Sequence, residues 1–346
     1  MGQKRDLRID LLRIFACFMV VFLHVSGQNW SRVNVHSMEW LAFNVYDSAV
    51  RSCVPLFFMI SGKLFLSRNQ LMPLKQLFQK NIGKLLIIYF VWSFLYAVDR
   101  IGISHLTIET LFEETLASEF HLWYLPALIG VYLMLPVLWC IVHYEQGKYL
   151  KYTCIAVWVL GILRATFLAL PFLPDIIREL LSTFSFDLGI YCGYFLMGYY
   201  IDNIKEKWQH IKTIYFIGVL IFVTVVGIIL TQIYSLYNGE QVSFLYENQT
   251  FFPAVEAILI LMIFLKIPIH QSMYRLQTKI VQVSHYTLFV YLFHPFVIEH
   301  LDNLLHINSL SFNAWFSVPI LSIGITLFSM FMAHIFSKIH LIKHWI

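Results

Sequence analysis

The feature that most constrains the fold of this chain is a series of long apolar runs separated by polar segments. A helix needs ~20 apolar residues to cross a bilayer, and several runs reach that length. Of the 346 residues 59% are hydrophobic and only 13% are charged, about half the charged share of a soluble domain. We therefore predict an all-α polytopic membrane helix bundle, a single domain over 1–346, with about ten transmembrane helices at 9–27, 45–66, 82–98, 122–142, 151–170, 186–201, 211–231, 251–267, 284–300 and 312–337.

Basic residues alternate between the polar segments in the pattern typical of a multi-pass membrane protein. If the N-terminus is cytoplasmic, the segments on the inner side hold most of the Lys and Arg, whereas the outer segments hold only Arg32, Arg100 and Arg178. This positive-inside pattern predicts that both termini are cytoplasmic. The net charge of +4 is then an orientation signal, and we expect no nucleic-acid partner.

Several further features of the chain support this picture. No small-residue cleavage site follows the first run, which we therefore expect to be retained as a span. The outer segment 99–121 is rich in acidic residues and is expected to hold a short amphipathic helix. The five cysteines fall within apolar runs and lack metal-ligand spacing, which predicts buried thiols and no metal site.

Two ionisable residues inside the first run carry the strongest functional signal. Arg13 and His24 are eleven residues apart, so on an α-helix they differ by ~20° around the axis and by roughly 16 Å along it. Asp10 falls on the same stripe. Because such groups are costly in a bilayer, we expect them to face the bundle interior, either to act on a substrate or to pair with a neighbour.

The second run holds three further candidates for lining the bundle interior. Asp47 and Arg51 are four residues apart and share one helical face, so they either form an intrahelical ion pair or contact a substrate. Pro55 is expected to kink or break this helix. Ser61 lies toward its inner end.

The remaining candidates are spread along the chain. Lys80 and Lys84 form a cationic patch that either contacts anionic lipid or docks a phosphorylated cytosolic donor. Trp123 belongs to an interfacial aromatic belt or to the site. Glu256 is a lone carboxyl at membrane depth and needs a partner. His294 is either a hydrogen-bonded core histidine or a reacting one.

Signatures of soluble enzymes are missing from the sequence. It has no Gly-rich phosphate loop, no Gly-x-Ser-x-Gly elbow and no His-Glu-x-x-His motif. The His-x-x-x-x-Asp signature of soluble acyltransferases is also missing, because the fifth residue after His24 is Asn29. Any acyl chemistry therefore needs another arrangement.

Five segments, in order along the chain, resemble the acyltransferase-3 family of integral membrane acyltransferases. The first of them includes the family's Arg-x10-His pair, formed here by Arg13 and His24. Within the family the chain is most similar to surface-glycan O-acetyltransferases and to the membrane domain of vancomycin-resistance serine racemases. The segments that carry the resemblance are residues 8–24, 54–62, 121–126, 193–200 and 288–295.

The resemblance implies a multi-pass O-acetyltransferase of the bacterial inner membrane. Such an enzyme moves an acyl group, usually acetyl from acetyl-CoA, to a hydroxyl of a cell-surface glycan or lipid-linked saccharide, with no metal. By this analogy His24 is the catalytic imidazole, as general base or covalent acyl carrier, and Arg13 is its companion. Lys80 and Lys84 would hold CoA, where many members carry an Arg-x-x-Arg pair. The implied partners are acyl-CoA, the saccharide acceptor and membrane lipids.

Two rival functions fit the same residues. A transporter for a small, serine-like solute would place the charged side chains along a solute or proton path, formed by Arg13, His24, Asp47, Arg51 and Glu256. A structural membrane protein would keep the fold without activity. Transfer of label from acetyl-CoA distinguishes the enzyme from both.

Overall fold

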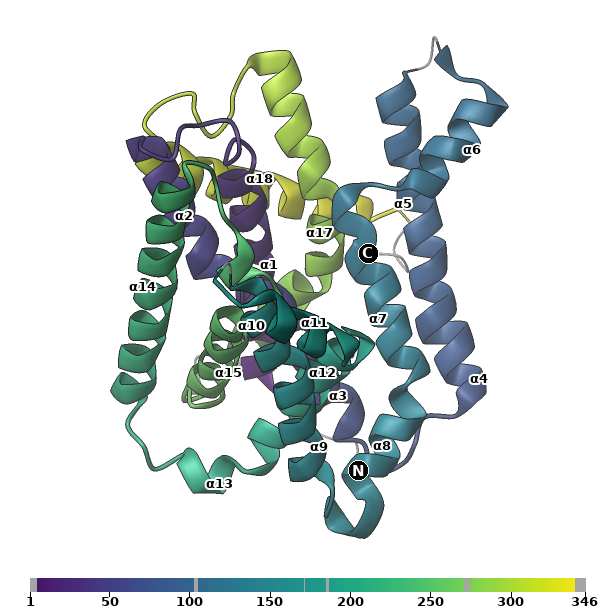
Figure 1. Cartoon of the computed structure of the whole chain (residues 1–346). Helices are drawn as coiled ribbons and strands as arrows, with labels where there is room; N and C mark the ends of the chain where they lie inside the picture. Colours follow the sequence, from purple (N-terminus) through teal and green to yellow (C-terminus); the bar gives the residue numbers. More distant parts are fainter. Residues whose placement is uncertain are drawn as a thin grey trace.

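The structure, a computed structural model, describes residues 5–339 apart from 103–104, 171, 185–186, 271–272 and 274. Within these residues it is helical and contains no strand, which confirms the predicted all-α bundle. Figure 1 shows the long helices side by side. The helices that position the site are α1 (Leu7–Gly27), α2 (Met38–Val50), α3 (Cys53–Leu66), α5 (Gly83–Ile101), α7 (Tyr124–Leu133), α12 (Asp187–Asn203), α15 (Phe251–Leu265) and α17 (Gln277–Leu305).

The other elements complete the bundle and its ends. They are α4 (Leu74–Gln76), η1 (Leu77–Ile82), α6 (Ile108–Ala117), η3 (Phe120–Trp123), α8 (Leu135–His143), η4 (Tyr144–Gln146), α9 (Leu150–Val157), η5 (Trp158–Leu163), α10 (Arg164–Ala169), α11 (Asp175–Thr183), α13 (Lys205–Trp208), α14 (Thr213–Asn238), η6 (Phe244–Tyr246) and α18 (Ala314–Phe336). The short helix predicted within 99–121 is present as α6.

Among the described residues, eight helices are long and apolar enough to cross a membrane. The pair formed by Phe120–Leu133 and Leu135–Gln146 is bent by 51° and makes a ninth if it is one span. Ten spans were expected. The difference lies at 186–201, where α12 has 17 residues and a length of about 26 Å, short of the ~30 Å hydrocarbon core.

The predicted second span is divided into two helices. It begins at Met38, earlier than the expected residue 45, and it breaks at Arg51 and Ser52 between α2 and α3. Pro55 therefore does not kink the middle of a helix. It lies in the first turn of α3, where its missing N–H leaves no hydrogen bond unmade.

Helices α3 and α12 pack together through two glycines. A Cβ atom on Gly62 would lie 1.8 Å from the carbonyl oxygen of Phe195, and one on Gly198 would lie 2.0 Å from the carbonyl oxygen of Met59. Each glycine therefore receives the backbone of the opposite helix. Small residues allow this close approach, which is a common source of helix association in membranes.

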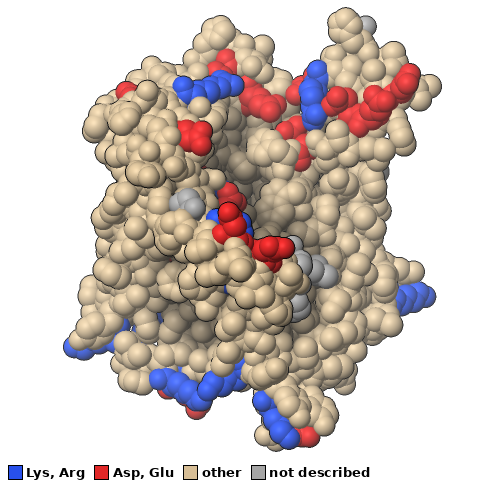
Figure 2. Space-filling view, viewed as in Figure 1, with Lys and Arg blue, Asp and Glu red and all other residues tan. Residues whose placement is uncertain are grey.

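The two ends of the bundle differ in charge. Figure 2 shows Lys and Arg gathered along its lower edge and Asp and Glu along its upper edge. In Figure 1 the lower end carries α13 and the upper end carries α6. We call the lower end the basic end, and the positive-inside rule assigns it to the cytoplasm.

The start of α1 and the end of α18 lie near the same stretch of α17. Arg5, just before α1, lies 3.3 Å from the ring of His285 near the start of α17. The hydroxyl of Tyr286 lies 3.0 Å from His334, in the last turn of α18. The start of α1 and the end of α18 therefore share one end, although Lys4 and Lys343 lie outside the described residues.

Candidate functional site

Arg13 and His24 line the same cavity within the bundle. This central cavity has a volume of about 390 Å³, and α17 and α7 also line it. Helix α1 packs against α2, α3, α17 and α18, so its polar stripe faces protein along its length. The three-turn spacing of the two residues accounts for their presence on one wall, roughly 16 Å apart along the helix.

Two other histidines lie beside His24. The ring centroid of His294, on α17, is 5.0 Å from that of His24, and the ring centroid of His121, in η3, is 5.9 Å from that of His294. His294 is fully buried, and its Nδ1 donates to the carbonyl of Val290 at 2.9 Å, which leaves Nε2 as an acceptor. In the described part of the chain, neither this Nε2 nor either ring nitrogen of His121 has a hydrogen-bond partner.

The central cavity is positively charged. Arg13, Arg51 and Lys84 contribute to its lining, and no Asp or Glu appears among the described residues that line it. A thioester carbonyl that is attacked by a nucleophile becomes an oxyanion, and fixed cations stabilise such a charge in a water-poor site. The lining therefore combines imidazoles that can move a proton with cations that favour developing negative charge.

A second cavity lies at the basic end, and we call it the inner cavity. It has a volume of about 720 Å³ and shares Arg13 and His285 with the central cavity. Charged side chains dominate its wall, among them Arg5, Arg8 and Lys63. Arg13 and His285 therefore lie between the two cavities, which adjoin along α1 in the direction from the basic end toward His24.

Asp10 belongs to the inner cavity rather than to the central one. Its two carboxylate oxygens accept from Nη2 and Nε of Arg5 at 2.7 and 2.8 Å. The same guanidinium reaches His285. The stripe predicted on α1 is thus shared between two cavities, with Asp10 fixing a cation at the inner one.

Asp47 and Arg51 form the ion pair that was one of the two interpretations of their spacing. Nη2 of Arg51 donates to the carboxylate at 2.5 Å, and Asp47 is 1% exposed. Arg51 also lines the central cavity, with its guanidinium 4.9 Å from the ring centroid of Tyr246. Arg51 is therefore positioned to contact a bound substrate as well.

The predicted pair of Lys80 and Lys84 is separated by the structure. Lys84 lines the central cavity, whereas Lys80 is exposed and lines neither cavity. Lys80 lies in the π-helical turn η1, whereas Lys84 lies in the first turn of α5.

Three other candidates lie in different surroundings. Trp123 lines the central cavity and is 40% exposed, so it lies where this cavity reaches the surface. Ser61 is next to the hydroxyls of Tyr124 and Tyr132 and does not line the cavity. Glu256 lies apart, where it accepts from Thr224 on α14 at 2.6 Å.

Three residues that line the central cavity were not among the predicted site residues. His121 stands in the His-Leu-Trp-Tyr segment, which we expected to form an aromatic belt, yet it is only 2% exposed. His285 joins the two cavities, and Asn248 lines the central one with its buried Oδ1 unpaired among the described residues. The position of His121 directly before an apolar run could have indicated that it is buried. No local sequence pattern indicates a role for Asn248.

Among the described residues no group of three His, Cys, Asp or Glu is placed to hold a metal ion. The five cysteines are free, and four are buried as predicted. Cys140 is exposed, because its position on α8 faces away from the bundle core.

Comparisons with known proteins gave one result. A family model described as an acyltransferase domain matches residues 6–334, a range that contains every candidate residue discussed above. No curated protein and no solved structure matches the chain.

Proposed function

Since this chain belongs to the acyltransferase-3 family and is a membrane acyltransferase, we propose that it transfers an acetyl group from cytosolic acetyl-CoA. The acceptor is a hydroxyl of a cell-surface glycan or lipid-linked saccharide on the outer side of the bacterial inner membrane. The observation that supports this proposal is that the inner cavity and the central cavity adjoin at Arg13, with His24 in the central cavity. A donor made in the cytoplasm can thus place its thioester inside the bundle.

The acceptor enters from the opposite end of the same cavity. His24 follows Arg13 by three turns toward that end, and Trp123 stands where the cavity reaches the surface. Figure 2 shows the molecule hollowed in the upper half of this face. Aromatic rings such as that of Trp123 offer an apolar surface for a sugar ring, and Arg51 and Asn248 offer polar contacts for its hydroxyls.

His24 can serve the transfer by two routes. As a general base it removes the proton of the acceptor hydroxyl while the oxygen bonds to the thioester carbonyl carbon, and it returns the proton to the departing CoA thiolate. As a covalent carrier its ring nitrogen displaces the thiolate and then passes the acyl group to the hydroxyl. Rapid quenching with labelled donor separates them, because only the second route leaves acyl-enzyme when acceptor is absent.

Labelled acetyl-CoA tests the proposed function directly. Membranes that contain the protein should transfer label to a surface glycan or a lipid-linked saccharide, and membranes without it should not. Deletion of the gene should remove the ester from the same polymer. Uptake of labelled serine without any acetyl transfer would contradict the proposal and favour a transporter.

A further inference from the structure

A third hollow lies at the basic end, outside the two cavities described above. This basic pocket has a volume of about 480 Å³ and contains three cations in its lining, Arg8, Lys205 and Lys266, with no Asp or Glu among its described lining residues. The cations come from the start of α1, from α13 and from the residue after α15. Only the folded chain brings them together.

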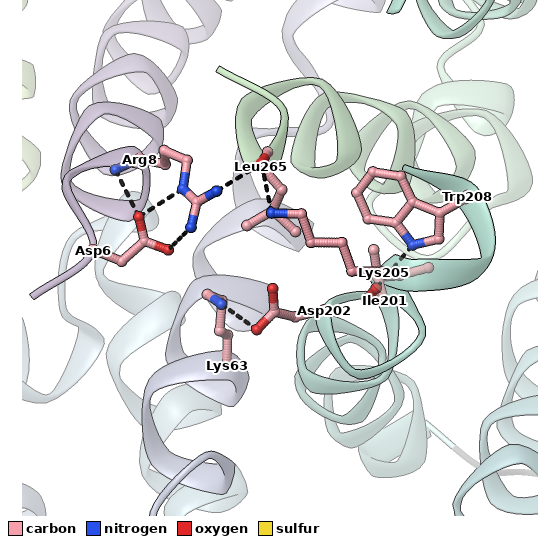
Figure 3. A network of polar contacts seen from close by, with 8 residues as sticks. All are labelled: Asp6, Arg8, Lys63, Ile201, Asp202, Lys205, Trp208 and Leu265. Atoms are coloured by element: carbon pink, nitrogen blue, oxygen red, sulfur yellow. Dashed lines mark hydrogen bonds and ion pairs between the residues drawn. The ribbon is translucent and has the colours of Figure 1, made fainter. Parts of the chain in front are cut away.

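Backbone carbonyls hold these cations in place, as Figure 3 shows for two of them. The carbonyl of Leu265 accepts from Nη1 of Arg8 and from Nζ of Lys205, both at 3.0 Å. Nζ of Lys266 donates to the carbonyls of Gln209 and Ile211 at 2.6 and 2.5 Å. Carbonyls fix the positions of the ammonium groups without cancelling their charge.

The two nearby carboxylates are each paired with a cation, one of them with Arg8 of this pocket. Asp6 accepts from Nε and Nη2 of Arg8 at 2.8 and 2.9 Å, and Asp202 pairs with Lys63. Within the described chain no carboxylate lies within ion-pair distance of Lys205 or Lys266. Burial lowers the pKa of Lys205 and the charge of Arg8 lowers it further, while Asp202 and Asp6 act in the opposite direction, and a bound anion would favour the charged form.

The basic pocket adjoins the row of cavities that ends at His24. It shares Arg8 and Ile269 with the inner cavity, which shares Arg13 with the central cavity. Arg8 and His24 are sixteen residues apart on α1, a distance of about 24 Å along the helix. A ligand with an anionic head in the basic pocket and a long flexible arm therefore reaches the three histidines.

We propose that the basic pocket binds the phosphorylated nucleotide end of the acyl donor, which is an adenosine 3′,5′-bisphosphate group. The inference rests on the proposed function. Lys205 and Lys266 supply the charge, Arg8 lies beside them with Asp6 as its partner, and lysine and arginine are the usual phosphate binders. The thioester arm then lies along the inner and central cavities. Lys80, which was expected to hold the donor, takes no part.

A binding measurement tests the site without requiring catalysis. Adenosine 3′,5′-bisphosphate is titrated into the full-length protein in phosphatidylcholine nanodiscs. The double variant Lys205→Gln and Lys266→Gln removes two charges and keeps amide donors for the carbonyls. The control, Lys207→Gln and Lys212→Gln, removes two exposed charges that do not line the pocket. We expect the Kd to rise at least about tenfold in the first and to stay unchanged in the second.

Equal affinity in the wild type and the first double variant would overturn the inference. Thermal melting checks that the variants are folded, and Lys205→Gln alone replaces the double variant if that one is not. Headgroup phosphate of an anionic lipid has the same chemistry as the bisphosphate. If phosphatidylglycerol nanodiscs protect these lysines from modification while the bisphosphate does not, the pocket binds lipid and the inference is wrong.

Kinetics separate failure of the inference from failure of the proposed function. The first double variant should raise the KM for acetyl-CoA and leave kcat unchanged, and it should not affect transfer from S-acetylpantetheine, which lacks the nucleotide. Transfer with an unchanged KM would refute the pocket and leave the function standing. Charge-dependent bisphosphate binding without transfer from either donor would refute the function and leave the pocket standing.

Discussion

Arg13 lines both the inner and the central cavity, so under the proposed function its guanidinium lies beside the arm of the donor. A planar guanidinium can bind a carbonyl or phosphate oxygen with two parallel N–H groups, whereas the lysine ammonium is a point charge. We therefore expect Arg13→Gln to lower kcat/KM by about 10²–10³-fold and Arg13→Lys to lower it less.

The measurement for Arg13 is acetyl transfer from labelled acetyl-CoA by purified variants. Arg32→Gln is the matched control, because Arg32 is exposed and lines neither cavity. A normal kcat/KM in Arg13→Gln would show that the junction of the two cavities is not part of the reaction path.

At the scale of residues, the sequence predicted the stripe on α1 but not its surroundings. The helical period is a local property, so it places Arg13 and His24 on one face. The contact between His24 and His294 joins residues 270 positions apart, and no local pattern reports it. Lys80 and Lys84, predicted as one patch, lie in different elements, and of the two only Lys84 lines the central cavity.

At the scale of elements, the packing of α3 on α12 makes a prediction about two glycines. Gly198→Ala would place a Cβ 2.0 Å from the carbonyl oxygen of Met59 and must force the helices apart. We expect it to destabilise the fold by at least about 3 kcal/mol, the upper end of overpacking costs. Thermal melting of the purified protein measures the loss.

Gly218→Ala is the control, because a Cβ on Gly218 of α14 meets nothing within 4 Å. It should melt at the wild-type temperature or slightly above, since alanine favours helix more than glycine does. If both variants melt alike, the contact between α3 and α12 is looser than the structure indicates.

The positions of the helices were largely predictable, and their irregularities were not. Apolar run length is set by the bilayer, so most predicted spans coincide with helices. The break at Arg51 and Ser52 and the shortness of α12 depend on packing within the bundle, which a hydropathy pattern does not contain. The thickness of the bilayer determines the length of an apolar run. It does not determine where a helix ends inside the protein.

At the scale of the whole molecule, the account requires the basic end to face the cytoplasm. Lys207 is exposed on α13 at that end, and Glu113 is exposed on α6 at the other. In a background that carries Cys140→Ser, we expect Glu113→Cys to react with a membrane-impermeant maleimide on intact cells. Lys207→Cys should react only after the cells are permeabilised.

The reverse labelling pattern would place the basic pocket outside the cell, away from any coenzyme A. The orientation is a prediction from the sequence, since the distribution of lysine is a property of the polar segments alone. The basic pocket was not readable, because Arg8, Lys205 and Lys266 meet only when three distant segments fold together.

The proposed reaction depends on the imidazole of His24, either as general base or as carrier of the acyl group. Replacement of this one side chain is the most direct test. We predict that His24→Ala lowers acetyl transfer from acetyl-CoA by about 10²–10⁴-fold, with unchanged melting temperature and bisphosphate affinity. His36→Ala, at an exposed position on the outer segment, should keep full activity. A folded His24→Ala protein that transfers acetyl groups at the wild-type rate would contradict the account.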